Sequence, residues 1–320
     1  MKYDVTALGE LLIDLTQNGM SEQGNPILEA NPGGAPCNVL ALLSKMGHKA
    51  AFIGKVGKDG FGEQLTAGLK ETGICTDGLL YDEAVHTTLA VVHTYADGDR
   101  DFSFYRNPGA DMMLRAEEVK GEIIENSRIF HFGSLSMTDE PCRSAHLHAL
   151  KVAEQAGVLR SYDPNLRPPL WPDLDTAKEN ILELMGHCDI LKISDNEIQW
   201  LSGKDDYDEG IAWLRERFDI PLIFLTLGKD GSRAYCGDVR TEQPGFKMNT
   251  IETTGAGDTF FGSVLHHILT LGWRPYTKEE LDGMLKFANA AAALVTTRRG
   301  ALRVMPSNEE IAEILDKASL

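Results

Sequence analysis

The sequence predicts an α/β fold with a mainly parallel central sheet, helices on both faces and a small β lid. Short apolar runs alternate with amphipathic stretches, which is typical of parallel strands joined by helices. The predicted strands are residues 5–8, 50–56, 129–132, 158–162, 190–193 and 222–227. Because no repeat or Pro/Ser-rich linker divides residues 1–320, we expect a single domain.

Apolar residues at helical spacing mark two long helices between these strands. The first contains Val39, Leu40, Leu43 and Met46 and stops at Gly47; the second contains Leu281, Met284, Leu285, Ala288, Ala292 and Val295. The last helix should begin at Ser307, because Ser307 and Glu310 have the spacing of a capping box.

Two segments break the alternation of strands and helices. Residues 15–32 are polar and rich in glycine, and residues 87–107 contain two runs that flank the turn sequence ADGD at 96–99. The second segment therefore predicts a β-hairpin. Because this hairpin does not fit a parallel sheet, it can be a lid over a cleft or a decorated edge, and the pattern alone leaves both open.

Composition excludes several classes of function. The chain has 31 Lys and Arg against 48 Asp and Glu, a formal charge of −17, which disfavours binding to nucleic acid or anionic lipid. Small anions remain possible ligands, since backbone N–H groups and a metal ion can neutralise phosphate locally. The five scattered cysteines indicate free thiols, and the absence of a long apolar run predicts a cytoplasmic protein.

The most informative segment is residues 253–262, TTGAGDTFFG, which leads into a helical apolar pattern. Gly255, Ala256 and Gly257 leave the amides at a helix N-terminus unobstructed, which suits a group that gains negative charge. Asp258 follows in the first turn. A carboxylate in the first turn can be there simply because the helix dipole stabilises it. Beside an anion hole it can also act as a general base in phosphoryl transfer.

Other nucleotide and metal motifs are absent. The chain has no G-x-x-x-x-G-K-[S/T] sequence, and the G-x-G at 255–257 has Phe260 where a dinucleotide fingerprint needs its third glycine. The nine histidines include no H-x-x-x-H pair with an acidic partner, so a structural zinc site is not expected.

Several polar residues near predicted strand ends allow two interpretations each. Gly33 and Gly34 can form a turn or a hinge, and Asn38 can be an ordinary first-turn residue or an amide that reaches into a cleft. Ser194 and Glu197 have the spacing of a capping box, against a role near a metal. The segment DPNLR, 163–167, follows a strand, where open α/β sheets bind ligands. A lone arginine such as Arg106 is usually solvated.

These motifs, in this order, resemble the ribokinase-like carbohydrate kinases over nearly the whole chain. Within that family the sequence is most similar to the fructokinases, through GELLID at 9–14, PGGAP at 32–36, FIGKVG at 52–57, FYRNPGADM at 104–112 and YDPNLR at 162–167. The resemblance implies ATP, Mg²⁺ and transfer of the γ-phosphoryl group to a sugar hydroxyl, most simply making fructose 6-phosphate. A different sugar, such as 2-keto-3-deoxygluconate or ribose, and a catalytically silent binding protein are the alternatives.

The resemblance also implies roles for individual residues. Asp258 matches the catalytic base, and the backbone of Gly255, Ala256 and Gly257 matches the anion hole. Residues that match the sugar or phosphate contacts are Asp14, Gly33, Gly34, Asn38, Arg106 and Arg167, with the two glycines as the lid hinge. Residues that match the ATP border are Lys192, Thr226, Gly228, Gly231, Asn289 and Ala292, and Glu197 matches an acid that acts on Mg²⁺ through water.

The sequence departs from the family pattern at three positions. Ser194 stands where much of the wider family has Asn, and Leu40 stands at a usually small position. Glu252 replaces the Asp that commonly precedes the glycine loop and helps to bind a monovalent cation, which leaves activation by K⁺ open. The implied partners are a sugar and ATP, with a second copy of the chain pairing through the lid as a further expectation.

Overall fold

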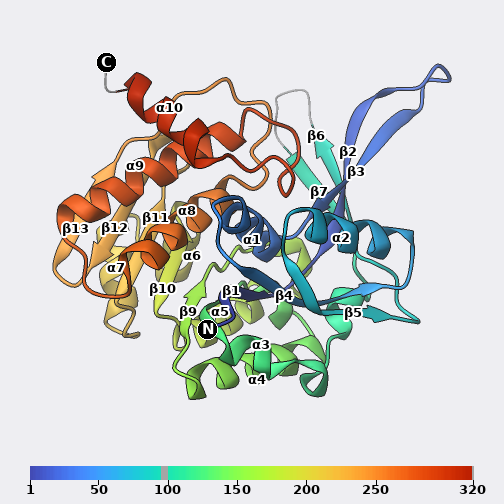
Figure 1. Ribbon diagram of the computed structural model, residues 1–320, viewed down its shortest axis with the longest axis horizontal. Helices are drawn as coiled ribbons and strands as arrows, with labels where there is room; N and C mark the ends of the chain where they lie inside the picture. The colour runs from blue at the N-terminus through green and yellow to red at the C-terminus, as the bar shows by residue number, and fades with distance from the viewer. Residues whose placement is uncertain (95–99, 319–320) are drawn as a thin grey trace.

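The computed structural model describes residues 1–94 and 100–318, which form a large β-sheet between helices and a smaller β-sheet that projects from the body of the molecule (Figure 1). In this part of the chain the larger sheet has nine strands in the order β13-β12-β11-β10-β9-β8-β1-β4-β5. Neighbours from β5 to β11 pair in parallel, whereas β12 and β13 are antiparallel. The predicted α/β class is confirmed.

Strands and helices alternate through most of the described residues. The strands are β1 (Tyr3–Leu8), β2 (Leu12–Met20), β3 (Pro26–Gly33), β4 (Ala50–Gly57), β5 (Cys75–Asp82), β6 (Leu89–Thr94), β7 (Arg100–Tyr105), β8 (Ser127–Phe132), β9 (Leu159–Tyr162), β10 (Ile190–Ser194), β11 (Leu222–Thr226), β12 (Ser232–Cys236) and β13 (Val239–Gln243). The helices are α1 (Ala35–Lys45), α2 (Gly60–Glu71), α3 (Gly121–Glu125), α4 (Cys142–Gln155), α5 (Leu174–Met185), α6 (Asp195–Ser202), α7 (Tyr207–Arg215), α8 (Ala256–Leu271), α9 (Lys278–Val295) and α10 (Asn308–Ala318). Short 3₁₀ turns include η1 (Ala110–Met113), η3 (Leu135–Met137) and η4 (Pro168–Leu170).

The six predicted strands of the core sheet appear as β1, β4, β8, β9, β10 and β11. The helix ends also follow local chemistry. Helix α1 carries Pro36 in its first turn, where a missing N–H costs nothing, and the chain leaves it through Gly47 at φ 87°. The predicted capping box of the last helix is present, with the Glu310 amide donating to Ser307 Oγ at 3.3 Å.

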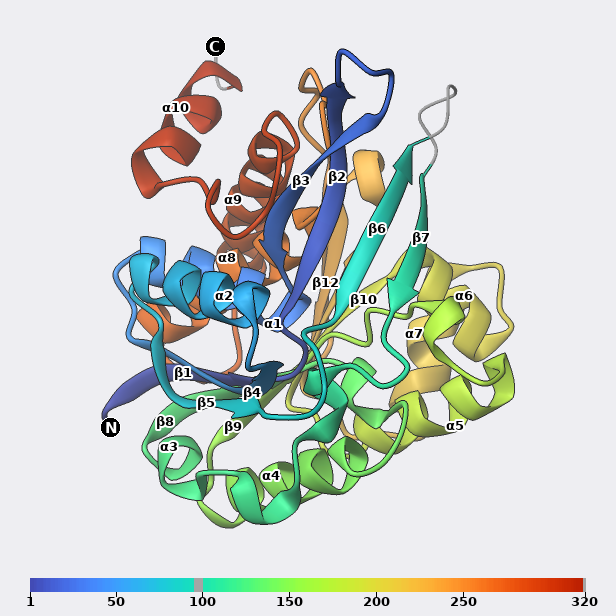
Figure 2. The same cartoon turned by 90° about the vertical axis from the view of Figure 1, so that its right-hand side faces the viewer.

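The core sheet separates two apolar cores. In β11, Leu222 and Phe224 belong to one core, while Ile223 and Leu225 belong to the other, as the alternation of side chains along a strand requires. Helices α1, α2, α8, α9 and α10 cover the first face, and α3 to α7 cover the second (Figure 2). The predicted arrangement of helices on both faces is therefore correct.

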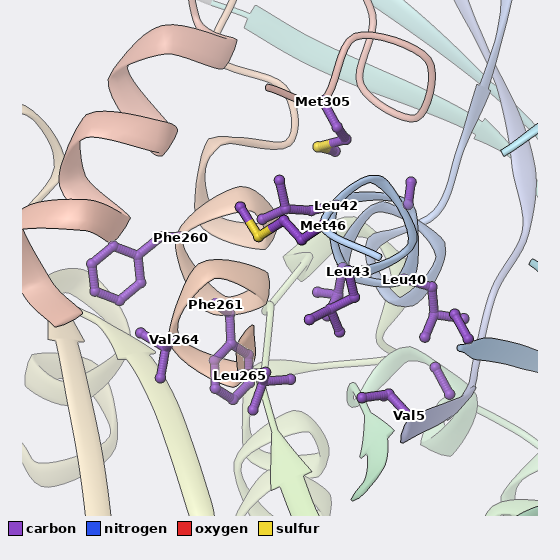
Figure 3. Close-up of a cluster of buried hydrophobic side chains, with 14 of the residues drawn as sticks. Val5, Leu40, Leu42, Leu43, Met46, Phe260, Phe261, Val264, Leu265 and Met305 are labelled. Carbon is purple, nitrogen blue, oxygen red and sulfur yellow. The ribbon is translucent and has the colours of Figure 1, made fainter. Parts of the chain in front are cut away.

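Helices α1 and α8 pack tightly against each other in the first core. Leu42, Leu43 and Met46 of α1 face Phe261 and its neighbours on α8 (Figure 3). The helices approach closely because α8 has a glycine at the contact: a Cβ on Gly262 would lie 2.9 Å from Leu42 Cδ2. This packing fixes the N-terminal turns of the two helices relative to each other.

The lid is a separate sheet with the strand order β3-β2-β6-β7. The hairpin predicted within residues 87–107 is confirmed as β6 and β7; its predicted turn at 96–99 lies outside the described residues. Residues 15–32, whose strands the sequence did not predict, form most of β2 and β3. Strand β2 pairs in parallel with β6, from Ile13 beside Leu89 onward, which joins the two segments into one sheet.

None of the helices in the described residues has the length and apolar character that a bilayer crossing requires. The five cysteines are free, as the sequence predicts, and four of them are buried: Cys37, Cys142, Cys188 and Cys236.

Candidate active site

A cavity of about 920 Å³ lies at the carboxyl ends of the parallel strands, between the core sheet and the lid. The lid contributes Leu12, Asp14 and Phe104 to its wall, and the strand ends contribute Lys192 and Thr226. Open α/β sheets bind ligands at this edge. The cavity is therefore the candidate active site.

The glycine loop predicted to form an anion hole opens helix α8 at this cavity. Gly255 is the N-cap with φ 78°, a left-handed conformation that favours glycine, and a Cβ there would lie 2.9 Å from Ala301 Cβ. Gly255, Ala256 and Gly257 all line the cavity. Amides in the first turn of a helix have no intrahelical acceptor, so this turn can bind an anion.

Asp258 lies in the same turn and is 9% exposed. Its carboxylate accepts a hydrogen bond of 2.7 Å from Nδ2 of Asn38, so the α1–α8 packing brings together two predicted site residues. Burial raises the pKa of Asp258, and the opposing effects of Asn38, Lys192 and Arg167 do not cancel that increase. The other amide atom, Asn38 Oδ1, is buried without a partner among the described residues. It can accept a hydroxyl hydrogen from a ligand.

Two further carboxylates, those of Asp14 and Glu10, line this end of the cavity. Burial, with a smaller contribution from Glu252, raises the pKa of Asp14 to about 7, although Arg167 opposes the increase. Burial also raises the pKa of Glu10 to about 7, and Glu10 Oε1 accepts a hydrogen bond of 3.0 Å from the Ala35 amide at the start of α1. This end of the cavity is therefore acidic and rich in hydrogen-bond acceptors.

The two predicted arginines have different surroundings. Arg167 lines the cavity, where its charge lowers the pKa of both Asp14 and Asp258. Arg106 is 8% exposed and is not among the lining residues of the described chain, so the alternative of a solvated arginine is wrong. Its guanidinium binds Asp111, and its contact with a sugar stays a prediction.

Gly33 and Gly34 also differ. Gly34 lines the cavity at φ 127°, and a Cβ on it would lie 2.4 Å from the Glu10 carbonyl oxygen. Gly33 ends β3, where it pairs with Leu12 of β2, and is not among the lining residues in the described part of the chain.

Comparisons with known proteins agree with this geometry. A family model described as pfkB family carbohydrate kinase matches residues 2–308. The chain belongs to the pfkB family of carbohydrate kinases. It is 41% identical to fructokinase-1 of Zea mays over 316 residues, which cover 98% of each protein.

Solved structures of pfkB kinases have the same fold. The fructokinase of Xylella fastidiosa with bound ATP superimposes with a TM-score of 0.90 and 29% identity over the whole of both chains. A double mutant of the Vibrio cholerae fructokinase, bound to fructose, ADP and potassium ion, gives a TM-score of 0.87 at 29% identity, covering 98% of each chain.

In this pfkB chain, Ser194 and Glu197 form the predicted capping box of α6. Glu197 Oε2 accepts from the Ser194 amide at 2.9 Å, and Oε1 accepts from the Leu166 amide at 2.8 Å. Burial opposes ionisation, but Lys192 and these amides outweigh it and lower the pKa of Glu197. Since Glu197 also lines the cavity, the capping role and a role near a metal are compatible.

The donor set fits a metal that is held through water. No group of three or more His, Cys, Asp or Glu side chains in residues 1–94 and 100–318 is arranged to ligate a metal directly. Mg²⁺ commonly keeps several waters and binds phosphate oxygens, so one ionised carboxylate at the cavity wall is sufficient.

Lys192 lies beneath the anion hole. Its ammonium group contacts both carboxylate oxygens of Asp163, at 3.0 and 3.1 Å, and a Cβ on Gly257 would lie 3.2 Å from Nζ. Burial lowers the pKa of Lys192, but Asp163 and Glu197 more than compensate, so the pKa is raised and the group stays protonated. The ammonium group places a positive charge beside the N-terminal turn of α8, and Asp163 partly offsets that charge.

The predicted nucleotide residues Thr226, Gly228, Gly231, Asn289 and Ala292 all line the cavity. Asn289 does not present a free amide: it donates to the carbonyls of Gln243 and Pro244, each at 3.1 Å, and accepts from Ser232 at 2.8 Å. Asn289 therefore shapes the wall of this end of the cavity and fixes the chain after β13.

Sequence reasoning missed several lining residues. Phe104 and Phe246 supply apolar walls, and Glu10 anchors α1. Asn165, inside the DPNLR segment, has φ 47° and lines the cavity. Asparagine after Asp-Pro is a recognisable signal for that conformation, whereas nothing local distinguishes the two phenylalanines from core residues.

Proposed function

We propose that this pfkB kinase transfers the γ-phosphoryl group of ATP to D-fructose, forming fructose 6-phosphate and ADP. The observation that carries the proposal is the Asp258 carboxylate, which stands at the N-terminus of α8 in a cavity that Asp14, Asn38 and Thr226 also line. The similarity to plant and bacterial fructokinases supports fructose as the acceptor.

In the proposed reaction the sugar binds against Asp14 and Asn38, with Asn38 Oδ1 accepting a hydroxyl hydrogen. Asp258 accepts the proton of the attacking hydroxyl. The negative charge of the phosphoryl group in the transition state is stabilised by the amides of residues 255–257, by Lys192 and by Arg167. Mg²⁺, when bound, would neutralise phosphate charge, with Glu197 holding it through water.

The lid is proposed to exclude water from the transfer. Leu12, Asp14 and Phe104 belong to the lid strands and face the cavity, so its closure over the sugar would replace water there. Gly33 and Gly34, where β3 passes into α1, are the proposed hinge. Exclusion of water prevents hydrolysis of ATP.

Product identification tests the acceptor directly. Incubation of the protein with ATP, Mg²⁺ and D-fructose should yield fructose 6-phosphate by phosphorus and carbon NMR. A panel containing ribose and 2-keto-3-deoxygluconate addresses the alternative, because the Arg167 guanidinium also suits a carboxylate. Preference for either compound would refute the fructose assignment, and absence of sugar-dependent ADP release would favour a silent binding protein.

Glu252 bears on the question whether a monovalent cation activates the enzyme. Glu252 links the loop before α8 to a second loop: it accepts from Thr254 Oγ1 at 2.7 Å and from the Gly300 amide at 3.0 Å. This link lies beside the anion hole, so K⁺ binding there would act on the amides of that turn. Rates in potassium and in tetramethylammonium buffers of equal ionic strength determine whether K⁺ activates.

We also propose a homodimer through the lid. The β2–β3 hairpin extends beyond the body of the molecule (Figure 1) and exposes Met20, Ile27 and Leu28 near its tip. Exposed apolar residues on a sheet favour pairing with a second copy. Light scattering with Ile27→Lys tests this: the variant should be monomeric at a concentration where the wild type is dimeric. A cytoplasmic location stays a prediction of the sequence.

A further inference from the structure

Both strands of the lid hairpin β6–β7 are tied to a single buried carboxylate. Asp111, in the turn η1, is 3% exposed. Its Oδ1 accepts a hydrogen bond of 2.5 Å from Thr88, the residue before β6. Its Oδ2 accepts a hydrogen bond of 2.8 Å from Nε of Arg106, the residue after β7. The base of the hairpin is therefore closed by side chains as well as by strand pairing.

Arg106 extends the connection from the lid to the cavity wall. Besides Asp111, its guanidinium donates to Thr138 Oγ1 at 2.9 Å and to the Leu135 carbonyl at 3.0 Å. Leu135 begins the turn η3 and lines the cavity. One side chain thus joins the end of β7, the carboxylate in η1 and the wall in η3.

The side chains around Asp111 are tightly packed. A Cβ on Gly109 would lie 1.7 Å from Thr88 Oγ1 and 2.8 Å from Asp111 Oδ1. Burial of Arg106 lowers its pKa, but Asp111 outweighs this and the pKa is raised, so the guanidinium stays charged. Removing one partner from a buried ion pair leaves the other uncompensated, and such a contact holds a fixed arrangement.

We propose that Asp111 is the pivot of the β6–β7 part of the lid, and that Thr88 and Arg106 are positioning residues that act through it without contacting the sugar. Phe104, which pairs with Ala90 across the hairpin and faces the cavity, is the residue that the pivot places over the sugar end. The inference rests on the proposed sugar kinase function.

A loosened pivot has a specific chemical consequence. Without a well-placed lid, water can take the position of the sugar hydroxyl at the γ-phosphorus. The bond from the γ-phosphorus to the bridging oxygen then breaks, and the products are ADP, inorganic phosphate and a proton in place of ADP and sugar phosphate. Sugar affinity falls for the same reason, whereas Asp258 and the anion hole are unchanged.

Thr88→Val removes the tie to β6 and preserves shape, and Thr88→Ser is the matched control that keeps the hydroxyl. We expect Thr88→Val to raise the KM for fructose about tenfold and to raise the ratio of phosphate to sugar phosphate several-fold, with kcat within about threefold. Thr88→Ser should behave as the wild type. A wild-type KM and product ratio in a folded Thr88→Val protein would overturn the pivot.

Arg106→Lys distinguishes positioning from sugar contact. If Arg106 and Thr88 both act through Asp111, the double variant should raise KM no more than the stronger single variant. Multiplicative effects would show that Arg106 acts separately, and would overturn its assignment as a positioning residue. Thermal unfolding of each variant verifies the fold, and Thr88→Val carries the test alone if Arg106→Lys fails to fold.

Failure of the proposed function is distinguishable from failure of the pivot. A wild-type protein that phosphorylates no sugar would contradict the kinase assignment only. The pivot is then decided by amide hydrogen exchange in the unliganded proteins. Residues 89–92 and 103–106 should exchange faster in Thr88→Val than in wild type or Thr88→Ser, and equal rates would overturn the pivot.

Discussion

The α1–α8 junction and the lid each form a wall of one cavity, but they are built differently. The junction is a close-packed contact whose residues, such as Leu42, Phe261 and Val264, are completely buried (Figure 3). The lid hairpin β2–β3 instead ends in exposed residues, among them Met20 and Ile27. The proposed base lies on the rigid wall, and the groups proposed to enclose the sugar lie on the wall that can move.

This division predicts which kinetic constant each wall controls. Changes at the junction should lower kcat or stability, because they alter Asp258 and its partner Asn38. Changes in the lid should raise the KM for sugar and increase hydrolysis, because they alter enclosure.

The largest expected effect is that of Asp258→Asn. Loss of a general base should lower kcat about 10³-fold, while the KM for fructose changes less than about threefold. Steady-state kinetics with coupled detection of ADP measure both constants. Asp195→Asn, a change of a carboxylate that also lines the cavity, is the matched control and should retain activity within about tenfold. Activity of Asp258→Asn close to that of wild type would remove the assignment of the base.

Phe261→Ala tests the packing of the junction. The side chain is completely buried, so we expect a loss of about 3–5 kcal/mol in the free energy of unfolding. The control is Met20→Ala in the lid, which is 56% exposed and should change that free energy by less than about 0.5 kcal/mol. Urea unfolding measures both. Similar losses in the two variants would contradict the contrast between the walls.

Much of the core fold is predictable because its signals are local. Buried parallel strands read as apolar runs, and the glycine loop, the Ser307 capping box and the stop at Gly47 are short-range patterns. The strands β2 and β3 were not predicted, because residues 15–32 form a sheet with little burial and so lack alternation of apolar and polar residues. Their pairing with β6 depends on contacts between distant segments.

In the candidate site, too, the residues with local sequence signals were predictable and those that depend on distant contacts were not. Asp258 and the glycine loop are recognisable from the sequence, since a helix N-terminus has a local signature. The environment of Arg106 was not recognisable, because its partners Asp111 and Thr138 come from two other turns. The use of Asn289 to fix the wall was likewise invisible, as it depends on carbonyls 45 and 46 residues away.

Arg167→Gln tests the role of a charged residue that reaches the cavity from neither the α1–α8 junction nor the lid. Arg167 lowers the pKa of Asp14 and Asp258, so its removal should raise the pKa of both acids further. We expect the acidic limb of the kcat/KM profile to move to higher pH and kcat to fall about tenfold, through loss of charge stabilisation. A profile from pH 5 to pH 9 measures the shift. An unchanged limb would place Arg167 outside the reacting groups.

Asp14→Asn tests how a carboxylate of the lid affects the stability of the folded protein. Burial raises the pKa of Asp14 from 3.8 to about 7, so the folded protein binds the proton more tightly than the unfolded chain. Ionisation therefore costs stability, and the cost develops between these two pH values as pH rises. At pH 8 the variant should be more stable than wild type by up to about 4 kcal/mol, and the difference should largely vanish near pH 4. Unfolding in urea at both pH values measures the difference, and no gain at pH 8 would contradict it.

The topology of the lid has a consequence for biosynthesis. Its two hairpins leave the core at separate places, β2–β3 between β1 and β4, and β6–β7 between β5 and β8. Their parallel pairing joins strands that are separated in the chain by α1, β4, α2 and β5. A ribosome-bound fragment that ends before β6 can assemble part of the core sheet, yet its first hairpin has no neighbour. The lid sheet can therefore be completed only after β6 and β7 have been synthesised.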